Sequence, residues 1–438
     1  MRKNYLLGMA LMASLSFYSC DKEVIYVQDG NGVESVADGA QIITLQVENG
    51  GDGLATRAGR PLYSAEAKQT IENVKLWICD NTGKVVYVKE ISNWNTDGST
   101  VYTTGGHGRQ TTIELKDMDK LAAGSYKVYA VGYSNSSDYV LTDVTNVAED
   151  GNFSENMVLS LSNTVGEEIF AGQMEFTVET GKGFKKPIVL NRQVAGAFAY
   201  VKDIPFMEGA KYLKLVASAQ NQSLVLGNFN SVDLAGNGSG NDANVKYVVN
   251  GENGKSGSET YEISSIDLNE WFTAIKDENG DNLIDAGDNW KNPYSSEGHP
   301  TFQKGSAFGG EFVIPFAHVD GKQTLTLQLT NAGGNVLRSW KVNLRSSDEQ
   351  LDQTITCWNS VSTDWSTEVT DESANIYSLV RNHLYGIGTR MNDDPGEGTD
   401  PEPNPSDPDD QPESLNNKQE LVLKVNDNWE VIHGMELE

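Results

Sequence analysis

Basic residues are scarce in this chain of 438 residues: 33 lysines and arginines stand against 62 aspartates and glutamates, which gives a net charge of −29. Binding to a nucleic acid requires a stripe of basic side chains that neutralises phosphates, and the sequence lacks one. We therefore expect no nucleic-acid partner. The acidity is better explained as a contribution to solubility.

Cysteine is equally rare, because the chain holds only Cys20, Cys79 and Cys357. Three cysteines are too few for a disulfide scaffold, and we expect Cys79 and Cys357, in different domains, to be buried thiols. The HExxH, GxSxG and P-loop motifs are absent. The five histidines do not have the spacing of metal ligands; they are His107, His299, His318, His383 and His433. The sequence predicts that the protein is not an enzyme and requires no cofactor.

Short runs of Val, Ile, Thr and Tyr recur between Asn, Asp and Gly turns, and this composition is typical of an all-β protein. The spacing of the runs predicts two β-sandwiches in series, over 58–189 and 190–391, with no βαβ alternation. In the first domain we expect a strand pair over 73–79 and 84–91, a helical turn near 117–124 and a strand over 125–134.

The first twenty residues have the form of an export signal. Arg2 and Lys3 precede an apolar stretch over 5–18 that is too short to span a bilayer, and a small residue, Ser19, precedes Cys20. We expect a signal peptide over 1–19, a lipidated propeptide over 20–57, and Cys20 as the acylated residue that attaches the precursor to a membrane. An ordinary signal peptide cut nearby is the alternative.

The stretch Gln41–Glu48 predicts a strand with one buried face, because Ile43, Leu45 and Val47 alternate with the residues between them. A glycine-rich loop over 49–60 follows and contains Arg57 and Ala58. Such exposed loops are preferred sites of proteolysis. A cut after Arg57 would sever the lipidated segment and this strand from the body, whereas the alternative is that Arg57 is an ordinary surface arginine.

The carboxyl end combines a tether with two strand patterns. Residues 393–413 hold six prolines, nine acids and no basic residue, and we expect a tether over 392–418. Beyond it, 419–438 shows two runs that alternate between apolar and other residues. Their candidate donor-strand residues are Leu421, Leu423, Val425, Trp429, Val431, His433, Met435 and Leu437. Two strands alone are marginal in water, so this tail must pair with its own body or with another molecule.

One acidic loop, 277–288, is close to the EF-hand calcium pattern. The oxygens that would bind a structural Ca²⁺ belong to Asp277, Asn279, Asp281, Asp285, Asp288 and the Leu283 carbonyl. Asn282 replaces the usual glycine, which is tolerable because Asn can adopt a positive φ. The last ligand is a short Asp in place of Glu. An acidic surface turn without an ion is the alternative.

These features together resemble the fimbrillins, the major stalk subunits of the type V pili of Bacteroidia. The resemblance rests on the lipoprotein leader, the Thr56-Arg57-Ala58 site after a first strand, LNRQVAG at Leu190, RNHLYGI at Arg381, and an acidic tether before NDNWEVIHGMELE. It implies two transthyretin-like sandwiches and a precursor lipidated at the outer membrane. It also implies cleavage between Arg57 and Ala58 by an arginine-specific protease.

The resemblance further implies that the strand at about 41–48 is lost and that a donor at about 420–437 replaces it in a neighbouring copy. The product would be a cell-surface fimbrium that serves adhesion, with anchor and tip pilins as further partners. An anchor subunit would lack the cut site and a tip subunit would lack the donor tail, whereas this chain has both. The competing hypothesis is a calcium-stabilised, carbohydrate-binding surface lipoprotein whose tail docks on its own body.

Overall fold

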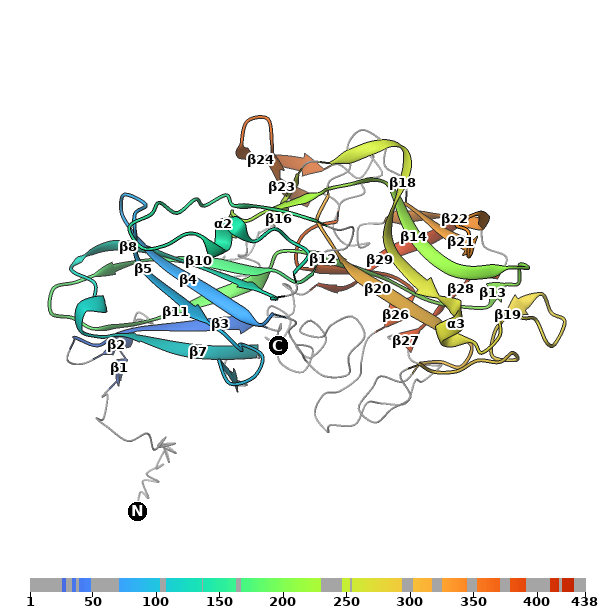
Figure 1. Ribbon diagram of the computed structural model, residues 1–438, viewed down its shortest axis with the longest axis horizontal. Helices are drawn as coiled ribbons and strands as arrows, with labels where there is room; N and C mark the ends of the chain where they lie inside the picture. The colour runs from blue at the N-terminus through green and yellow to red at the C-terminus, as the bar shows by residue number, and fades with distance from the viewer. Residues whose placement is uncertain are drawn as a thin grey trace, which may run out of the picture.

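Two bodies built of β strands lie side by side in this computed structural model (Figure 1). The structure describes residues 26–28, 34–36, 39–48, 71–102, 108–135, 137–162, 167–229, 246–252, 254–293, 302–316, 325–344, 353–370, 379–390, 410–416 and 420–428. The prediction of an all-β protein is confirmed. Cys20, Arg57 and Ala58, and the residues 429–438, lie outside these ranges.

Helices are few and short in the described part of the chain. The longest are single turns, α2 (Thr142–Thr145) and α3 (Leu268–Trp271), together with a 3₁₀ turn, η2 (Asp117–Asp119), where the sequence predicts a helical turn. No helix there has the length and hydrophobicity needed to cross a membrane.

The first body is an eight-stranded sheet folded into two layers. One layer has the order β5-β4-β8-β10 and the other the order β11-β3-β7-β6. The layers join where β10 and β11 pair through only Phe170 with Arg192 and Ala171 with Asn191. The strands are β3 (Gln41–Glu48), β4 (Asn73–Asp80), β5 (Val85–Ile91), β6 (Thr100–Tyr102), β7 (Gly108–Leu115), β8 (Gly124–Tyr133), β10 (Phe170–Val178) and β11 (Phe184–Arg192).

Local chemistry explains the predicted hairpin between β4 and β5. The Asp80 carboxylate accepts hydrogen bonds from the amides of Thr82 (2.8 Å) and Lys84 (3.1 Å), and Gly83 has a φ of 82°. Asp and Gly are favoured in such turns for these two reasons. Apolar side chains of the strands on either side then fill a core between the layers, to which β3, β4, β7, β8, β10 and β11 all contribute.

The second body has the same plan, with β29 inserted between its layers and no strand in the position of β6 among the described residues. One layer has the order β18-β14-β21-β22, and β29 connects it to a layer with the order β25-β12-β20. The strands are β12 (Ala195–Lys202), β14 (Ala210–Gln220), β18 (Lys255–Asp267), β20 (Ala307–Val313), β21 (Leu325–Asn331), β22 (Val336–Leu344), β25 (His383–Ile387) and β29 (Glu420–Asn428).

The two sandwiches are topological copies of each other. In each, the first strand lies parallel to the last strand of the domain and antiparallel to the fourth: β3 lies between β11 and β7, and β12 lies between β25 and β20. The other four strands follow one another in the same order, as β5-β4-β8-β10 and as β18-β14-β21-β22. The seven-stranded unit is therefore used twice, and β29 has no counterpart in the first sandwich.

Short ladders complete the fold. They are β1 (Tyr26–Gln28) with β2 (Glu34–Val36), β13 (Ile204–Pro205) with β19 (Leu283–Ile284), β15 (Ser223–Val225) with β9 (Val158–Ser160) and β17 (Gly251–Glu252), β23 (Gln353–Asn359) with β16 (Lys246–Val249) and β24 (Asp364–Thr370), β26 (Thr389–Arg390) with β27 (Asp410–Gln411), and β28 (Glu413–Ser414) with β12.

Two boundaries differ from the expected ones. Leu190 does not open the second sandwich, because the alternation of β11 continues to Arg192 and β12 begins only at Ala195. The tether expected over 392–418 returns to the body before its end. Leu415 is fully buried in the second core, and β28 pairs with β12. A single apolar side chain among the acids gives the chain this point of attachment.

Candidate functional site

Strand β3 occupies an interior slot of the first sandwich. It pairs along its length with β11 on one side and with β7 on the other. The predicted inward residues Ile43, Leu45 and Val47 are all 0% exposed and belong to the core. Burying three such side chains contributes roughly 5 to 9 kcal/mol before entropy. The predicted buried face is confirmed.

Strand β3 lies inside the sheet and not at its edge, because both of its backbone edges are paired. The sequence reveals which face of a strand is buried but not how many neighbours it has. The consequence for the site is large. Without β3, β11 and β7 would each present a row of unpaired amides and carbonyls, on either side of an apolar trough.

Polar contacts hold the amino-terminal end of β3. The Gln41 side chain accepts a hydrogen bond from the Leu121 amide (2.7 Å) and donates one to the Leu121 carbonyl (2.9 Å). The Lys120 ammonium donates to the Gly39 carbonyl (3.0 Å), and the Phe184 amide donates to the Ala40 carbonyl (2.8 Å). Hydrogen bonds from Lys120, Leu121 and Phe184 therefore hold the start of β3 against the rest of the sandwich.

The first half of the tail belongs to its own body. In β29, residues 420–423 run parallel to β22, and residues 424–428 run antiparallel to β25. Leu421 is 2% exposed in the second core. In this structure Leu421, Leu423 and Val425 therefore lie in a strand of their own body, and their role in a donor stays a prediction. β29 completes the sheet between β22 and β25, which would otherwise have open edges.

The two sequence motifs at Leu190 and Arg381 meet between the sandwiches. The Arg192 guanidinium donates to Glu168 Oε1 at 2.6 and 2.8 Å, and the two side chains are 2% and 0% exposed. Arg192 also lies over the Phe170 ring, 4.9 Å from its centroid, and donates to Asn382 Oδ1 (3.5 Å). A charge-assisted pair of this kind, inside a dry interface, holds its partners in one geometry.

Arg381 makes the reciprocal contacts from the second sandwich. Its guanidinium donates to Gln193 Oε1 (3.2 Å) and to the carbonyls of Gly227 (3.0 Å) and Asn228 (2.8 Å). The Asn382 amide donates to the Val194 carbonyl (2.9 Å). We call the contacts of Glu168, Arg192, Gln193, Arg381 and Asn382 the joint. The motifs were visible in the sequence, but nothing in them showed that they face each other.

A third core extends the joint. It combines Trp77 and Tyr129 of the first sandwich with Leu224, Leu226 and Ile314 of the second, all of them buried. In addition, the indole of Trp365 on β24 donates to Asn156 Oδ1 (3.0 Å). Apolar burial and buried polar contacts thus connect the two sandwiches over a wide surface.

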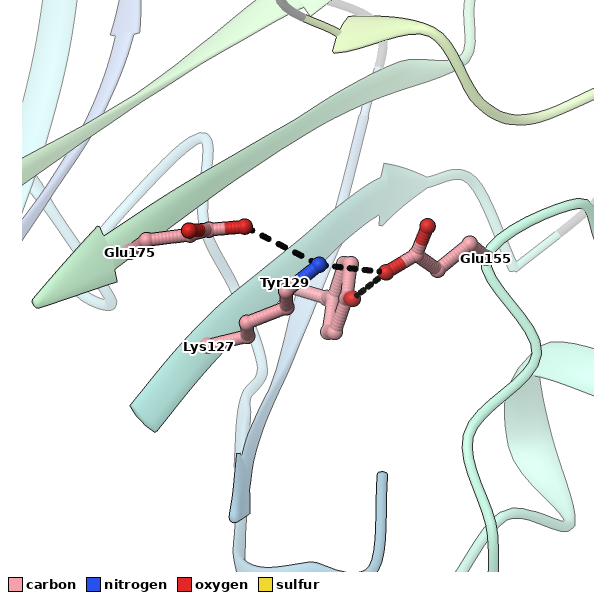
Figure 2. Close-up of polar contacts among 4 residues, drawn as sticks. All are labelled: Lys127, Tyr129, Glu155 and Glu175. Atoms are coloured by element: carbon pink, nitrogen blue, oxygen red, sulfur yellow. Dashed lines mark hydrogen bonds and ion pairs between the residues drawn. The ribbon is translucent and has the colours of Figure 1, made fainter. Parts of the chain in front are cut away.

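Beside this core, a polar cluster fastens the loop that carries Glu155 to strand β8 (Figure 2). The Lys127 ammonium lies 3.0 Å from Glu155 and 2.9 Å from Glu175, and the Tyr129 hydroxyl donates to Glu155. The hydrogen bond from Tyr129 is the main reason that the pKa of Glu155 is lowered. Because Lys127, Glu155 and Glu175 are 40%, 50% and 62% exposed, their ion pairs add little stability, and their role is to position the loop.

The two cysteines differ in environment. Cys79 is buried, and burial raises the pKa of its thiol to about 12, with a further contribution from Asp80 and Glu155. It is therefore buried, as expected, and its raised pKa makes the thiol unreactive. Cys357 is half-buried instead of buried, because β23 lies outside the main sandwich layers. No disulfide joins the pair.

The acidic loop 277–288 uses its carboxylates as turn acceptors. Asp277 accepts hydrogen bonds from the amides of Gly280 (2.6 Å) and Asn282 (2.8 Å), and Asp288 accepts from those of Glu278 (2.8 Å) and Asp285 (2.9 Å). As expected, Asn282 takes a positive φ, of 66°. No group of three or more metal-binding side chains is gathered anywhere in the described ranges. Calcium binding stays a prediction.

No family model and no curated protein matches the sequence. Solved structures match at low similarity. A fimbrial assembly protein from Parabacteroides distasonis is 12% identical, with 78% of this chain and 98% of that one covered, at a TM-score of 0.36. The fimbrial anchor protein Mfa2 from Porphyromonas gingivalis is 9% identical, with 78% and 99% covered, at 0.32. The tip fimbrial protein Mfa3 from the same organism is 10% identical, with 76% and 98% covered, at 0.32. Matches this weak do not decide the function, which must follow from the chain's own strands.

Proposed function

We propose that this protein is a structural subunit of a cell-surface fimbrium and that its copies join by exchanging a strand. The observation that carries the proposal is the position of β3. A strand with both edges paired and three fully buried side chains is followed by a glycine-rich loop that contains Arg57. A cut after Arg57 leaves β3 attached to the body by non-covalent contacts alone.

Loss of β3 activates the subunit. The slot then exposes two unpaired strand edges and an apolar trough, and an incoming strand from another copy satisfies both by β-augmentation. While β3 is in place, the same edges are paired, so the precursor stays monomeric. Cleavage therefore separates synthesis and export from assembly.

The donor consists of only the last part of the tail. Because β29 is built into the second sandwich, the segment that can reach another copy is 429–438, which carries Trp429, Val431, His433, Met435 and Leu437. Ten residues extend to about 33 Å, which is enough to cover a slot that held eight. β29, which is paired within the second sandwich, then attaches the donor firmly to its own subunit.

Export and attachment belong to the same proposal. A precursor acylated at Cys20 is held at the outer membrane until an arginine-specific protease removes 20–57. The released subunits then polymerise head to tail, with anchor and tip pilins at the two ends, and the filament serves adhesion. A contact of this kind between different surfaces does not close on itself and so produces a filament.

The test uses the precursor, an arginine-specific protease and two variants. Wild type should yield a product that begins at Ala58 by mass spectrometry and fibres by electron microscopy, whereas Arg57→Ala should yield neither. Arg60→Ala, three residues further along the same loop, is the matched control and should behave as wild type. Deletion of 429–438 should permit cleavage and abolish fibres.

Two outcomes would contradict the proposal. One is fibre formation by Arg57→Ala after protease treatment, and the other is fibre formation without 429–438. Monodisperse particles from fully cleaved wild type would instead favour the binding-module hypothesis, in which the tail serves only its own body.

A further inference from the structure

We infer that Gln41, Lys120 and Leu121 form a latch, which keeps β3 in its slot after the chain has been cut. The latch adds a step to the proposed strand exchange, on which this inference rests. Proteolysis breaks the chain, but the opening of the latch sets the rate at which slots become free. The burial of β3, the place of its contacts and one weak point within it all support this step.

Both faces of β3 are covered in the first sandwich. The inward residues Ile43, Leu45 and Val47 are 0% exposed, and on the outward face Ile42 and Thr44 are each only 8% exposed. The backbone of the strand pairs along its length with β11 and with β7. A cut in the loop after β3 removes none of these contacts. The strand therefore stays in place when the chain is cut, and it leaves only when this part of the sandwich opens.

The latch lies at the amino-terminal end of β3. The Gln41 side chain bonds both backbone groups of Leu121, accepting from the N–H at 2.7 Å and donating to the carbonyl at 2.9 Å, and Gln41 is only 5% exposed. The Lys120 ammonium donates to the carbonyl of Gly39, just before the strand, at 3.0 Å. Because 80 positions separate Gln41 from Leu121, these bonds break when β3 moves away from the body.

The carboxyl-terminal end of β3 is the one that the cut sets free. In the two ladders Gln41 pairs on both sides of the strand, whereas Glu48 pairs only with Gly108 of β7. Arg57 follows this end in the sequence, so cleavage disconnects it from the body. Release therefore proceeds from Glu48 toward Gln41, and the latch is the last contact to open.

One buried group weakens β3 in its slot. The Thr44 hydroxyl is buried and forms no hydrogen bond with any of the described residues. A hydroxyl that is taken out of water without a partner makes the bound strand less stable. The latch and this hydroxyl thus act in opposite directions. Together they make β3 stable enough to occupy the slot and weak enough to be displaced from it.

Two measurements on the precursor test the latch. The first is hydrogen exchange of the β3 amides before any cut, and the second is the release of the fragment that carries β3 after cleavage and quenching of the protease. Gln41→Ala removes both bonds to Leu121 and should speed both processes about tenfold. Thr44→Val keeps the shape of the side chain without its hydroxyl and should slow both about tenfold.

Gln46→Ala is the matched control, because it truncates a glutamine of the same strand outside the latch. The Gln46 side chain is half-buried and donates to Gln110 Oε1 at 3.2 Å. This variant should exchange and release β3 within about twofold of wild type. In wild type, exchange at 46–48 should precede exchange at 41–43.

Three outcomes would overturn the latch and leave strand exchange intact. They are equal rates for Gln41→Ala and Gln46→Ala, exchange in wild type that begins at 41–43, and release of the fragment from wild type as fast as the chain is cut. Faster release by Thr44→Val would overturn the role of its hydroxyl. Failure of the protease to cut after Arg57 would instead overturn the proposed function, and hydrogen exchange of the uncut precursor would still test the latch.

Discussion

Arg192 and Glu168 show how a fully buried charge is tolerated between two apolar sandwiches. The guanidinium has a carboxylate at 2.6 Å, an amide oxygen at 3.5 Å and the face of Phe170 beside it. Buried pairs of this kind add little net stability compared with apolar packing, but removal of one partner leaves a charge stranded. Their contribution is therefore mainly to geometry.

Glu168→Gln should destabilise the protein by about 3 to 5 kcal/mol, because it leaves the Arg192 guanidinium without its counter-charge in a dry site. Chemical denaturation followed by tryptophan fluorescence measures the change. Glu175→Gln removes an exposed partner of Lys127 and is the matched control, with an expected cost of about 1 kcal/mol or less. Equal decreases in the free energy of unfolding for the two substitutions would show that water reaches the joint and screens its charges.

Strands β3 and β29 both contribute buried side chains to a core, and in the proposed assembly only β3 is shed. Their core residues Leu45 and Leu421 are 0% and 2% exposed, so truncation of either creates a cavity. The difference between the strands lies in the chain around them. β3 is followed by the glycine-rich loop that contains Arg57, whereas β29 comes after β28, which pairs with β12.

Leu45→Ala and Leu421→Ala should each destabilise the precursor by about 2 to 5 kcal/mol. After cleavage and assembly, fibres of Leu45→Ala should match wild type in stability, because β3 is gone, whereas fibres of Leu421→Ala should keep the defect. Thermal unfolding of precursor and fibres measures both. Persistence of the Leu45→Ala defect in fibres would mean that β3 is retained.

Sequence reasoning predicted those elements whose signal is local. The alternation of Ile43, Leu45 and Val47 defines a strand and its buried face, and the Asp-Asn-Thr-Gly stretch at 80–83 defines a hairpin, because in each case neighbours in the chain carry the information. The loop at 277–288 likewise has its expected turn conformation at Asn282.

Pairing between distant segments was not predictable in this way. Nothing in Gln41–Glu48 reveals that β11 lies on one side and β7 on the other, and nothing in 420–428 distinguishes its own body from a neighbour as partner. Arg192 and Asn382 are 190 positions apart, so their contact at the joint depends on how the sandwiches dock. Non-local contacts of this kind are fixed only by the complete fold.

Considered as a whole, the protein consists of two sandwiches that share a core. Residues of both contribute to the buried cluster around Trp77, and Arg381 reaches from the second sandwich to Gln193 and the carbonyl of Gly227. A shared core of this extent couples the folding of its two parts.

Wild type should therefore unfold in a single calorimetric transition despite its two sandwiches. Arg381→Gln, which removes the buried guanidinium from the joint, should split this transition into two, with the less stable sandwich unfolding first. Differential scanning calorimetry provides the measurement. Two separate transitions in wild type would show that the shared core does not couple the sandwiches.

The repetition of one seven-stranded plan has a consequence for the shape of the assembly. β12 occupies the same slot in the second sandwich that β3 occupies in the first, but the two residues 193–194 connect it directly to β11 and leave no loop to cut. In the proposed assembly, only the β3 slot is therefore vacated by a single cut. Under that proposal each subunit accepts one neighbour and donates to one, which predicts a filament that grows without branches.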